Sequence, residues 1–426
     1  MRPQVRRPSR LGATACGALV LATALAAAPI LTTGTPGQSA PIVKITGEKH
    51  KLLLRADGTV AGWGLYRNGQ LGPVAPIQGT SSGASTSLVA IALPGKAVDV
   101  AAGTNASYAL LDDGTVVAWG RADAGQLGNG NTQAPRLATS TQSNEYRGVE
   151  TPARVAGLTD VAAIAAANDS AYAVLRDGTV RSWGNGAIGD GRAPSTWGGP
   201  SGANGPAFRP VAVPGLSDVA ALSAGGGTVL ALLKDGRVFS WGSNFYGALG
   251  RPPRTELALD TPGEIPDLRD VAQVAAGSGV STALLKDGTV RVWGSNWQQQ
   301  FGFRAPTTQP NPNGGWVLEP QPVPGVAQVT SIAVGNRHTL ALLKDGTLRA
   351  WGNTDFGQTG NGAGPGYQPL PIAIKITSVA TVFAAGDNSF ALRADGSLWA
   401  WGVGWTGAFP FGRDVRLPAP APPGLR

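Results

Sequence analysis

The sequence predicts an all-β protein, a seven-bladed β-propeller built from four-stranded antiparallel blades. One observation is a repeat: the stretch DGTVVAWG recurs in seven versions, and in each version the first and last glycines are six positions apart. A second is that the distance between copies varies from 50 to 64 residues, as expected for a fixed unit joined by loops of different length. A third is that the intervening sequence shows no helical periodicity. The copies occupy residues 57–64, 113–120, 177–184, 235–242, 287–294, 345–352 and 395–402.

Each copy predicts a β-hairpin. An alternating apolar run precedes the Asp-Gly pair, such as TVLALLK before Asp235, and a second run ending in Trp-Gly follows it. We expect a type I′ turn at this pair, because both residues tolerate positive φ. A third apolar segment lies upstream, such as DVAALSAG from Asp218, and a fourth precedes that one, such as PVAVPGL from Pro210. Four short strands in each copy predict one propeller blade per copy.

The two ends of the repeat region suggest how the ring closes. The first copy begins at about Ile42 with no PVAVPGL-like segment before it. The chain ends in LPAPAPPGLR, residues 417–426, which resembles that segment. We therefore expect the C-terminal strand to complete the first blade and close the ring, so that sheet edges that would promote aggregation are hidden.

Residues 1–28 have the features of a signal peptide. Four arginines, Arg2, Arg6, Arg7 and Arg10, precede an apolar run that ends in three consecutive alanines at 26–28. The Arg6-Arg7 pair leaves a twin-arginine export route open, although ordinary secretion is favoured because the residues that usually follow such a pair are missing. We expect residues 29–40 to be a linker and residues 41–426 to form a single propeller domain.

The composition predicts a secreted, extracellular protein without a membrane span. The single cysteine, Cys16, lies inside the signal, so the mature chain has no disulfide, cysteine nucleophile or cysteine metal ligand. The formal charge of +8 falls to about +4 once the signal arginines are removed, and no Lys/Arg cluster remains. Nucleic acid is therefore not an expected partner. No second apolar stretch is long enough to cross a membrane.

A short turn motif after Trp-Gly carries a family resemblance. The mature chain resembles the RCC1-repeat (regulator of chromosome condensation) family, whose blades combine an Asp-Gly hairpin, Trp-Gly and a following Gly-Gln-Leu-Gly turn. Membership implies a seven-bladed propeller. The turns here are Gly69-Gln70-Leu71-Gly72, Gly125-Gln126-Leu127-Gly128, Gly247-Ala248-Leu249-Gly250 and Gly357-Gln358-Thr359-Gly360.

The two histidines are better explained by structure than by catalysis. His50 and His338 each lie three residues after a glycine and occupy the same repeat position, where the other copies include Ala106 and Val280. A catalytic residue has no reason to recur at a position that alanine and valine also fill. We expect both to brace a strand end with a hydrogen bond, and we expect no metal site and no cofactor.

The acidic residues also give no sign of an active site. Seven aspartates belong to Asp-Gly turns and four more open the DVA segment, so no pair of carboxylates stands out for glycoside hydrolysis. A G-x-S-x-G match at residues 79–83 lacks the strand and helix that a nucleophile elbow requires. We therefore expect the protein not to be an enzyme.

Aromatic residues in the connections after Trp-Gly are the candidate binding residues. The seven repeat tryptophans should pack between blades, which leaves several large aromatic residues in loops, the usual anchors of protein interfaces. Strand parity places these long, variable loops on the face opposite the Asp-Gly turns, and variable loops on a uniform scaffold commonly carry function. Capping of the blade ends remains an equal alternative. The candidates are Trp197, Trp297, Trp316, Trp405, Tyr246 and Phe301.

The resulting hypothesis is a secreted, monomeric, non-catalytic module that binds an extracellular or envelope protein. The resemblance offers a precedent, since the family includes secreted bacterial proteins that inhibit β-lactamases with loops on one propeller face. Alternatives are a propeller that binds or hydrolyses an envelope polymer or carbohydrate, and a structural or adhesive surface protein. We expect no guanine-nucleotide exchange, because a small GTPase would not be met outside the cytoplasm.

Overall fold

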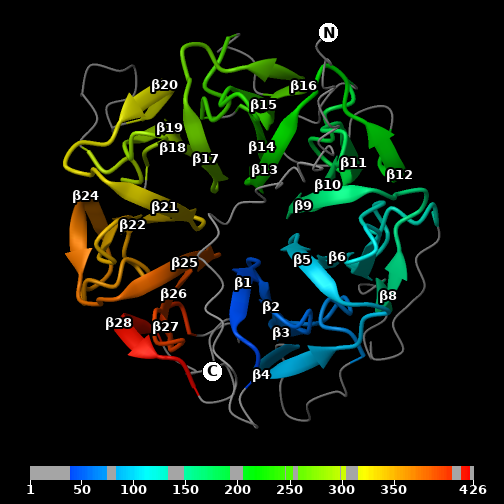
Figure 1. Ribbon diagram of the computed structural model, residues 1–426, viewed down its shortest axis with the longest axis horizontal. Coiled ribbons are helices and arrows are strands. Elements are labelled where there is room, and N and C mark those ends of the chain that lie inside the picture. The colour runs from blue at the N-terminus through cyan, green and yellow to red at the C-terminus, as the bar shows by residue number, and fades with distance from the viewer. Residues whose placement is uncertain are drawn as a thin grey trace, which may run out of the picture.

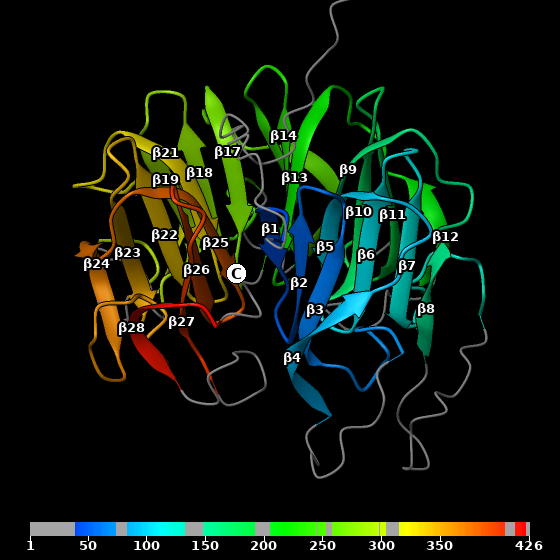
Figure 2. The ribbon, with the colours of Figure 1, turned by 60° about the horizontal axis from the view of Figure 1, so that its bottom comes forward.

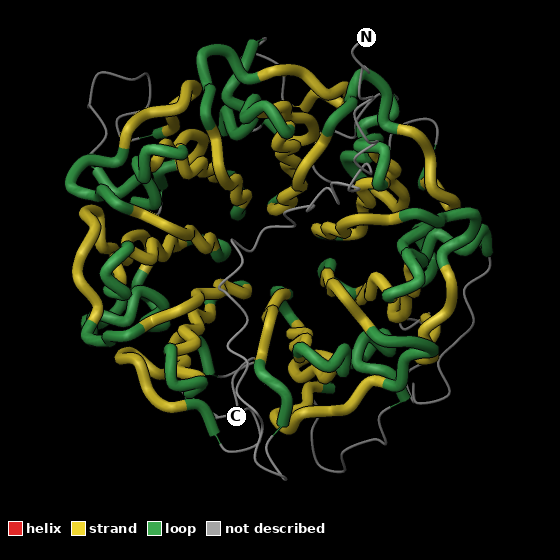
Figure 3. Tube along the Cα trace, viewed as in Figure 1, coloured by secondary structure: helices red, strands yellow, loops and turns green. Residues whose placement is uncertain are grey.

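The computed structural model has the expected seven-bladed fold. It describes residues 39–73, 83–132, 148–191, 205–244, 246–252, 258–297, 299–303, 315–404 and 414–422. These residues form seven four-stranded antiparallel sheets and contain no helix. The sheets stand around a central axis, with the first strand of each blade nearest the axis and the fourth at the rim (Figures 1 and 3). The predicted signal peptide lies outside the described residues.

Each blade is one continuous stretch of chain, and its strands pair in sequence order. The first four blades contain β1 (Ile42–Thr46), β2 (His50–Arg55), β3 (Val60–Leu65), β4 (Ala84–Ile91); β5 (Ala97–Ala102), β6 (Ala106–Leu111), β7 (Val116–Arg121), β8 (Gly148–Arg154); β9 (Val161–Ala167), β10 (Asp169–Leu175), β11 (Val180–Asn185), β12 (Ala207–Ala212); β13 (Val219–Gly225), β14 (Thr228–Leu233), β15 (Val238–Ser243) and β16 (Ala258–Glu264). The last three contain β17 (Val271–Ala276), β18 (Val280–Leu285), β19 (Val290–Ser295), β20 (Trp316–Pro322); β21 (Val329–Val334), β22 (His338–Leu343), β23 (Leu348–Asn353), β24 (Tyr367–Ile374); β25 (Val379–Ala385), β26 (Asn388–Arg393), β27 (Leu398–Gly402) and β28 (Val415–Pro420).

The Asp-Gly pairs form the expected hairpins, but the turn is of a different type. In blade 2 the amide of Gly114 donates to the carbonyl of Leu111 at 3.0 Å, and the amide of Leu111 donates to Thr115 at 2.8 Å. Only the glycine has positive φ, at 78°, so the connection is a three-residue loop and not a type I′ turn. Asp113 explains why aspartate precedes the glycine in this loop. Its Oδ1 accepts a hydrogen bond from the amide of Thr115 at 2.9 Å and so stabilises the loop.

The strand directions divide the connections between two faces. Because the four strands of a blade alternate in direction, the Asp-Gly turns lie on one face, which we call the Asp-Gly face. The turn between the first and second strands and the long connection between the third and fourth lie on the opposite face, which we call the loop face. Figure 2 shows the strands running between the two faces. The described ends of the long variable connections therefore lie on one face, in agreement with the strand parity expected from the sequence.

The closure of the ring differs from the prediction. The C-terminal strand β28 pairs with β27 of its own blade, and blade 1 is complete without it. The prediction assigned the PVAVPGL-like segment to the blade that follows it, whereas the segment forms the outer strand of the preceding blade. In blade 4, for example, β15 pairs Ser243 with Ala258 of β16. Blades 1 and 7 consequently meet by side-chain packing, and Figure 1 shows β1 beside β25.

The seam between blades 1 and 7 combines apolar and polar contacts. Ile45 and Trp63 of blade 1 pack in one buried cluster with Phe390 of blade 7, and the two aromatic rings meet edge to face at 6.1 Å. Glu48 reaches past blade 7, where its Oε1 accepts a hydrogen bond from Asn336 Nδ2 of blade 6 at 3.3 Å. Lys51 is fully buried beside these residues, and burial lowers the pKa of its ammonium group to about 8.

The repeat tryptophans link neighbouring blades, as predicted. All seven indoles are buried, and those of blades 2 to 7 reach from their own blade to the turn after Trp-Gly in the preceding blade, where Nε1 donates to a backbone carbonyl. The bonds run from Trp119 to Gln70, Trp183 to Gln126, Trp241 to Ala187, Trp293 to Ala248, Trp351 to Gln300 and Trp401 to Gln358, at 2.8 to 3.1 Å. One bond of this kind therefore fixes the depth at which adjacent blades dock.

The last glycine of the turn makes room for this indole. At Gly250 the backbone has φ of 66°, and a Cβ there would lie 2.7 Å from Nε1 of Trp293. A side chain at this position would therefore combine an unfavourable backbone conformation with a collision. This requirement explains why the turn motif and the tryptophan of the next blade occur together in the sequence.

We predict that Trp119→Leu lowers the free energy of unfolding by about 3 kcal/mol, because it opens a cavity and removes the donor to Gln70. Trp399→Leu is the matched control, since Trp399 is a half-buried tryptophan in the third strand of blade 7. Urea unfolding of both variants measures the difference. A loss at Trp119 no larger than that at Trp399 would contradict the role assigned to the repeat tryptophans.

Candidate functional site

Three of the six candidate aromatic residues meet on the loop face. The ring of Tyr246 lies 6.1 Å from that of Trp297 and 6.1 Å from that of Trp316, centroid to centroid. Trp297 is 49 % exposed, and the other two are half-buried. We call these three residues the aromatic cluster.

The cluster joins two blades. Tyr246 belongs to the turn after Trp-Gly in blade 4, whereas Trp297 follows β19 and Trp316 begins β20, both in blade 5. Gly279 of blade 5 gives the tyrosine room, because a Cβ there would lie 2.8 Å from Cδ2 of Tyr246. Trp316 is held by its strand pairing with Ser295, whose Oγ accepts the amide of Trp297 at 3.4 Å. The side chain of Tyr246 therefore crosses from blade 4 to blade 5, where it packs against Gly279 and the two tryptophans.

The ring distances decide what the cluster can bind. At 6.1 Å the tyrosine ring is in contact with both indoles, at tilts of 52° and 44°, so no space remains between the tyrosine and either tryptophan for a ligand group. The cluster is therefore a packed group of rings in which Trp297 is the most exposed. Such a group of rings can bury apolar or planar groups that are pressed onto Trp297.

The other candidate residues have different places. Phe301 is fully buried, stacks on Phe303 at 5.4 Å and packs beside Trp351 between blades 5 and 6. The expectation that Phe301 contacts a partner does not fit this burial. It occupies the turn position of the buried residues Leu71 and Leu249, a register that identifies it as part of the core. Trp197 and Trp405 lie outside the described residues.

Further aromatic residues extend the cluster along the loop face. Tyr367 is 50 % exposed and begins β24 in the same register as Trp316, since it pairs with Asn353 as Trp316 pairs with Ser295. Phe356 occupies the repeat position of Tyr246, and the guanidinium of Arg337 lies 6.0 Å from its ring. Alignment of the repeats could have identified both. Together with the cluster, Phe356 and Tyr367 form what we call the aromatic arc, across blades 4 to 6.

A charged network occupies another part of the loop face. Arg121 contacts both oxygens of Asp123, with Nε 2.6 Å from Oδ1, and its Nη1 lies 3.5 Å from Asp169 of blade 3. Asp169 also accepts a hydrogen bond from Gln126 Nε2 at 3.2 Å. Among the described residues of the loop face, the aromatic rings of the arc lie over blades 4 to 6, and paired charges lie over blades 2 and 3 and, at Arg337 and Asp387, over blades 6 and 7.

The two histidines occupy the structural role that was predicted. His50 Nε2 lies 2.8 Å from Oγ of Ser107, whose hydroxyl donates to the carbonyl of Gln70 at 2.8 Å. His50 therefore donates to the serine hydroxyl. The backbone carbonyl of Gln70 accepts hydrogen bonds both from Ser107 and from the indole of Trp119. His338 makes the same contact with Ser389 at 2.8 Å.

Both imidazoles are fully buried and electrically neutral near pH 7. Burial, assisted by the charge of Lys51, lowers the pKa of His50 to about 3. Burial likewise lowers the pKa of His338 to about 4. Neither ring therefore faces a site where it could exchange protons with a substrate. Within the described ranges, no group of three or more His, Cys, Asp or Glu side chains is arranged to hold a metal ion.

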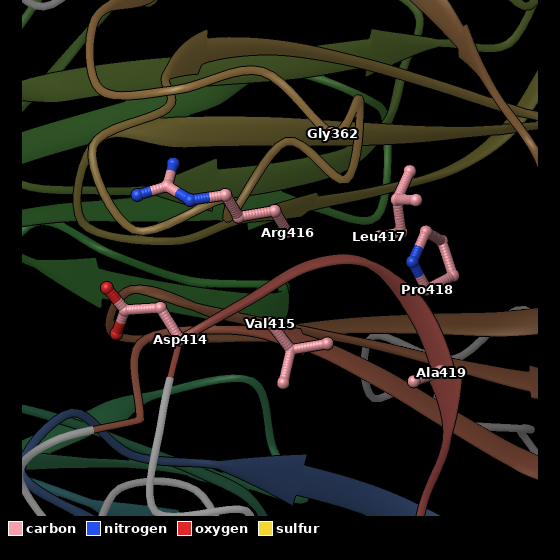
Figure 4. A pocket seen from close by; sticks show the side chains of 7 residues that line it. All are labelled: Gly362, Asp414, Val415, Arg416, Leu417, Pro418 and Ala419. Carbon is pink, nitrogen blue, oxygen red and sulfur yellow. The ribbon is translucent and has the colours of Figure 1, made fainter.

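A shallow groove at the rim contains an arginine that is already engaged. The groove lies between the blade 6 loop at Gly362 and residues Asp414–Ala419, which include most of β28 (Figure 4). The guanidinium of Arg416 donates to the backbone carbonyls of Asp355 at 3.0 Å and Ala363 at 2.9 Å. Its contacts tie the outer strand of blade 7 to blade 6.

The histidines predict an acid-dependent loss of stability. Because the pKa of each is lowered in the folded protein, the unfolded chain binds protons that the folded chain does not, starting from the ordinary pKa of 6.5. Stability is therefore full above pH 6.5 and falls toward pH 4, by about 1.4 kcal/mol per pH unit for each histidine.

The test replaces both residues with asparagine, which occupies the same repeat position at Asn388. We expect urea unfolding between pH 7 and pH 4.5 to show a shallower pH dependence in the His50→Asn, His338→Asn variant than in the wild type. Equal slopes in the two proteins would contradict the assignment.

Comparisons with known proteins agree with this fold. Sequence profiles of the regulator of chromosome condensation (RCC1) repeat match residues 97–126, 219–248, 271–300 and 329–358, and a second profile of the repeat matches 113–174 and 235–284. Human E3 ubiquitin-protein ligase HERC2 is 30 % identical over 337 residues, which are 76 % of this chain and 6 % of that protein. The ultraviolet-B receptor UVR8 of Arabidopsis thaliana is 27 % identical over 87 % of this chain and 78 % of its own.

Other relatives are matched over different shares of their length. Protein pim1 of Schizosaccharomyces pombe is 29 % identical over 72 % of this chain, and the match spans 58 % of pim1. The chain thus spans only part of several of these relatives.

Solved structures with a similar fold include RCC1-type propellers. A chain in the crystal structure of Kap60 bound to yeast RCC1 (Prp20) superposes with a TM-score of 0.68 at 23 % identity, covering 99 % of this chain and 91 % of that one. Human WBSCR16 superposes with a TM-score of 0.66 at 23 % identity, covering 84 % and 88 %. With its repeats matched in sequence and its blades matched in structure, this chain belongs to the RCC1-repeat family of β-propellers.

Proposed function

We propose that the protein is a secreted, non-catalytic module that binds a protein partner through the aromatic arc of its loop face. The observation that carries the proposal is the aromatic cluster, in which Tyr246 contacts both the half-exposed Trp297 and Trp316. A rigid, apolar platform next to polar groups has the anatomy of a protein-binding hot spot, where tryptophan and tyrosine dominate the binding energy.

Ring contacts within the cluster reduce the cost of binding. Because Tyr246 is half-buried and its ring contacts both Trp297 and Trp316, less side-chain freedom is lost when a partner covers the exposed ring of Trp297. The nearby Arg337, which lies over Phe356 and pairs with Oδ2 of Asp387 at 3.3 Å, adds a polar group at the edge of the same surface. A partner with an apolar or aromatic protrusion would match these features.

Relatives of this chain support a protein partner. Yeast RCC1 (Prp20), whose fold this chain shares, is bound to Kap60 in one solved structure, and binding of Prp20p to Gsp1p and histones accompanies another. The sequence features of export suggest that the partner of this chain is an extracellular or envelope protein. Inhibition of an extracellular enzyme, in the manner of the β-lactamase inhibitory members of the family, is the specific form that we propose.

Guanine-nucleotide exchange is the second candidate, because one relative is a guanine nucleotide exchange factor. SRM1 of Saccharomyces cerevisiae is 28 % identical over 371 residues, which are 76 % of this chain and 73 % of SRM1. The signal-like N-terminus argues against this activity. Release of labelled nucleotide from a small GTPase, measured with and without the protein, separates the two candidates: unchanged release favours the binding module.

We predict that Trp297→Ala weakens capture of the partner by about 30-fold, equivalent to about 2 kcal/mol, while the melting temperature changes little because the ring is half-exposed. Immobilised protein is exposed to secreted and envelope proteins of its own and neighbouring bacteria, and the affinity of each retained protein is then measured directly.

Trp399→Ala is the matched control, because Trp399 lies on blade 7 away from the aromatic arc. A protein that binds the wild type and the Trp399→Ala variant equally, but loses affinity for Trp297→Ala, supports the proposal. If affinity for every captured protein survives Trp297→Ala, the cluster is a cap and not a binding surface. Retention of envelope polysaccharide in place of protein would favour the alternative of a polymer-binding propeller.

A further inference from the structure

Six of the seven outer strands carry a proline at the same structural position. In each of these blades the proline stands three residues before the residue that ends the pairing with the third strand. In β8, for example, Pro152 stands three residues before Val155. The outer strand of blade 1, β4, has Leu88 at this position, three residues before Ile91. The six prolines are Pro152, Pro210, Pro262, Pro320, Pro371 and Pro418.

The position faces away from the blade. The amide of Val155 donates inward to the carbonyl of Val116 at 2.9 Å, and the equivalent amide of Val213 donates to Val180 at 3.1 Å. Backbone groups of a regular strand point alternately to its two sides, which directs the residue three positions earlier outward. The pairing with the third strand shifts register at a β-bulge beside this residue, as between Ser182 and Gly184 in blade 3. A proline there has no N–H to offer, and the free edge of the blade consequently cannot pair fully with another strand.

Blade 1 lacks this protection. β4 reads ASTSLVAI, with no proline and no charged residue, and it pairs Ile91 with Val60 and Val89 with Gly62. Ala90 lies between the paired residues Val89 and Ile91 and directs its N–H and C=O groups outward, and the carbonyl of Leu88, next to the inward amide of Val89, points the same way. The pairing of β4 with β3 shifts register between Val89 and Ser85. Ala90 is exposed, and among the described residues β4 has no strand partner besides β3. Its edge is therefore open to strand addition.

We propose that β4 is a docking edge for a second copy of this chain. Two β4 strands pair antiparallel about a two-fold axis at Val89, so that Leu88 of each copy lies opposite Ala90 of the other. Each such pair exchanges two N–H to C=O hydrogen bonds, and the symmetric arrangement gives four. All outward groups of Leu88 and Ala90 in both copies are then satisfied, and two blades join into one eight-stranded sheet.

The absence of charge on β4 favours a second copy as the occupant. A two-fold interface brings each residue near its own equivalent, so any charge near the axis would face the same charge. Other outer strands carry such charges, including Glu264 in β16 at the position of Ala90. β4 carries no charge. In the symmetric pairing, the N–H groups of Leu88 and Ala90 in one copy donate to the outward carbonyls of Ala90 and Leu88 in the other. This dimer departs from the monomer that the sequence led us to expect, and it does not depend on the aromatic arc.

Sedimentation of the purified protein, expressed from its full sequence and measured from about 1 µM to about 500 µM, tests the proposal. We expect the weight-average mass of the wild type to rise from one chain toward two. Leu88→Pro should remain at one chain over the same range, because it loses two of the four bonds. Its fold and melting temperature should stay close to those of the wild type, since six blades accept proline at this position.

A second variant guards against misfolding of the first. Ala90→Glu places like charges on the two sides of the axis, so we expect it to abolish the dimer at low salt and to recover part of it at high salt. Ala212→Glu, at the same position in blade 3 beside Pro210, is the control and should sediment as the wild type does. A wild type that stays at one chain throughout, or a dimer that survives both β4 variants, would overturn the proposal.

Discussion

The structure depends on one kind of hydrogen bond, which the repeat tryptophans of blades 2 to 7 donate from the indole to a turn carbonyl of the preceding blade. A single four-stranded blade has two faces to bury and cannot bury them alone, so the cores of the propeller lie between blades. In blade 5, Trp293 fills such a core and donates to Ala248, and Gly250 exists to let it approach. The bond fixes both the depth and the angle of docking, because an indole has only one donor.

This constraint also explains why one face is free to vary. The turn that receives the indole marks the start of each long connection, so every variable loop leaves the scaffold from the same, rigidly held point. On the opposite face, aspartates such as Asp113 satisfy their own turns and leave little chemistry available. Most polar groups of the repeats are thus used by the fold, and the aromatic rings on the loop face are the features that the fold itself does not require.

Blade 1 differs from the other blades in two features, although it meets blade 7 as all neighbouring blades meet, without a shared strand. It holds the buried Lys51 at the repeat position where blades 2 and 7 carry Ser107 and Ser389. It also carries the one outer strand without an edge proline. Because no strand is shared between blades, the outer strand of each blade keeps an edge without a strand partner among the described residues. These edges therefore need protection of their own.

The sequence by itself determined the number of blades, the hairpins, the tryptophans between blades and the bracing role of His50 and His338, because each of these is a local pattern repeated at constant spacing. It misassigned the C-terminal strand, because adjacency along the chain does not say on which neighbour a segment pairs. It took Phe301 for a surface residue, although the register of Leu249 marked it as core. Only the tertiary structure brought Tyr246 of one blade onto Trp297 and Trp316 of the next, since contact between blades depends on how the repeats dock and not on their spacing.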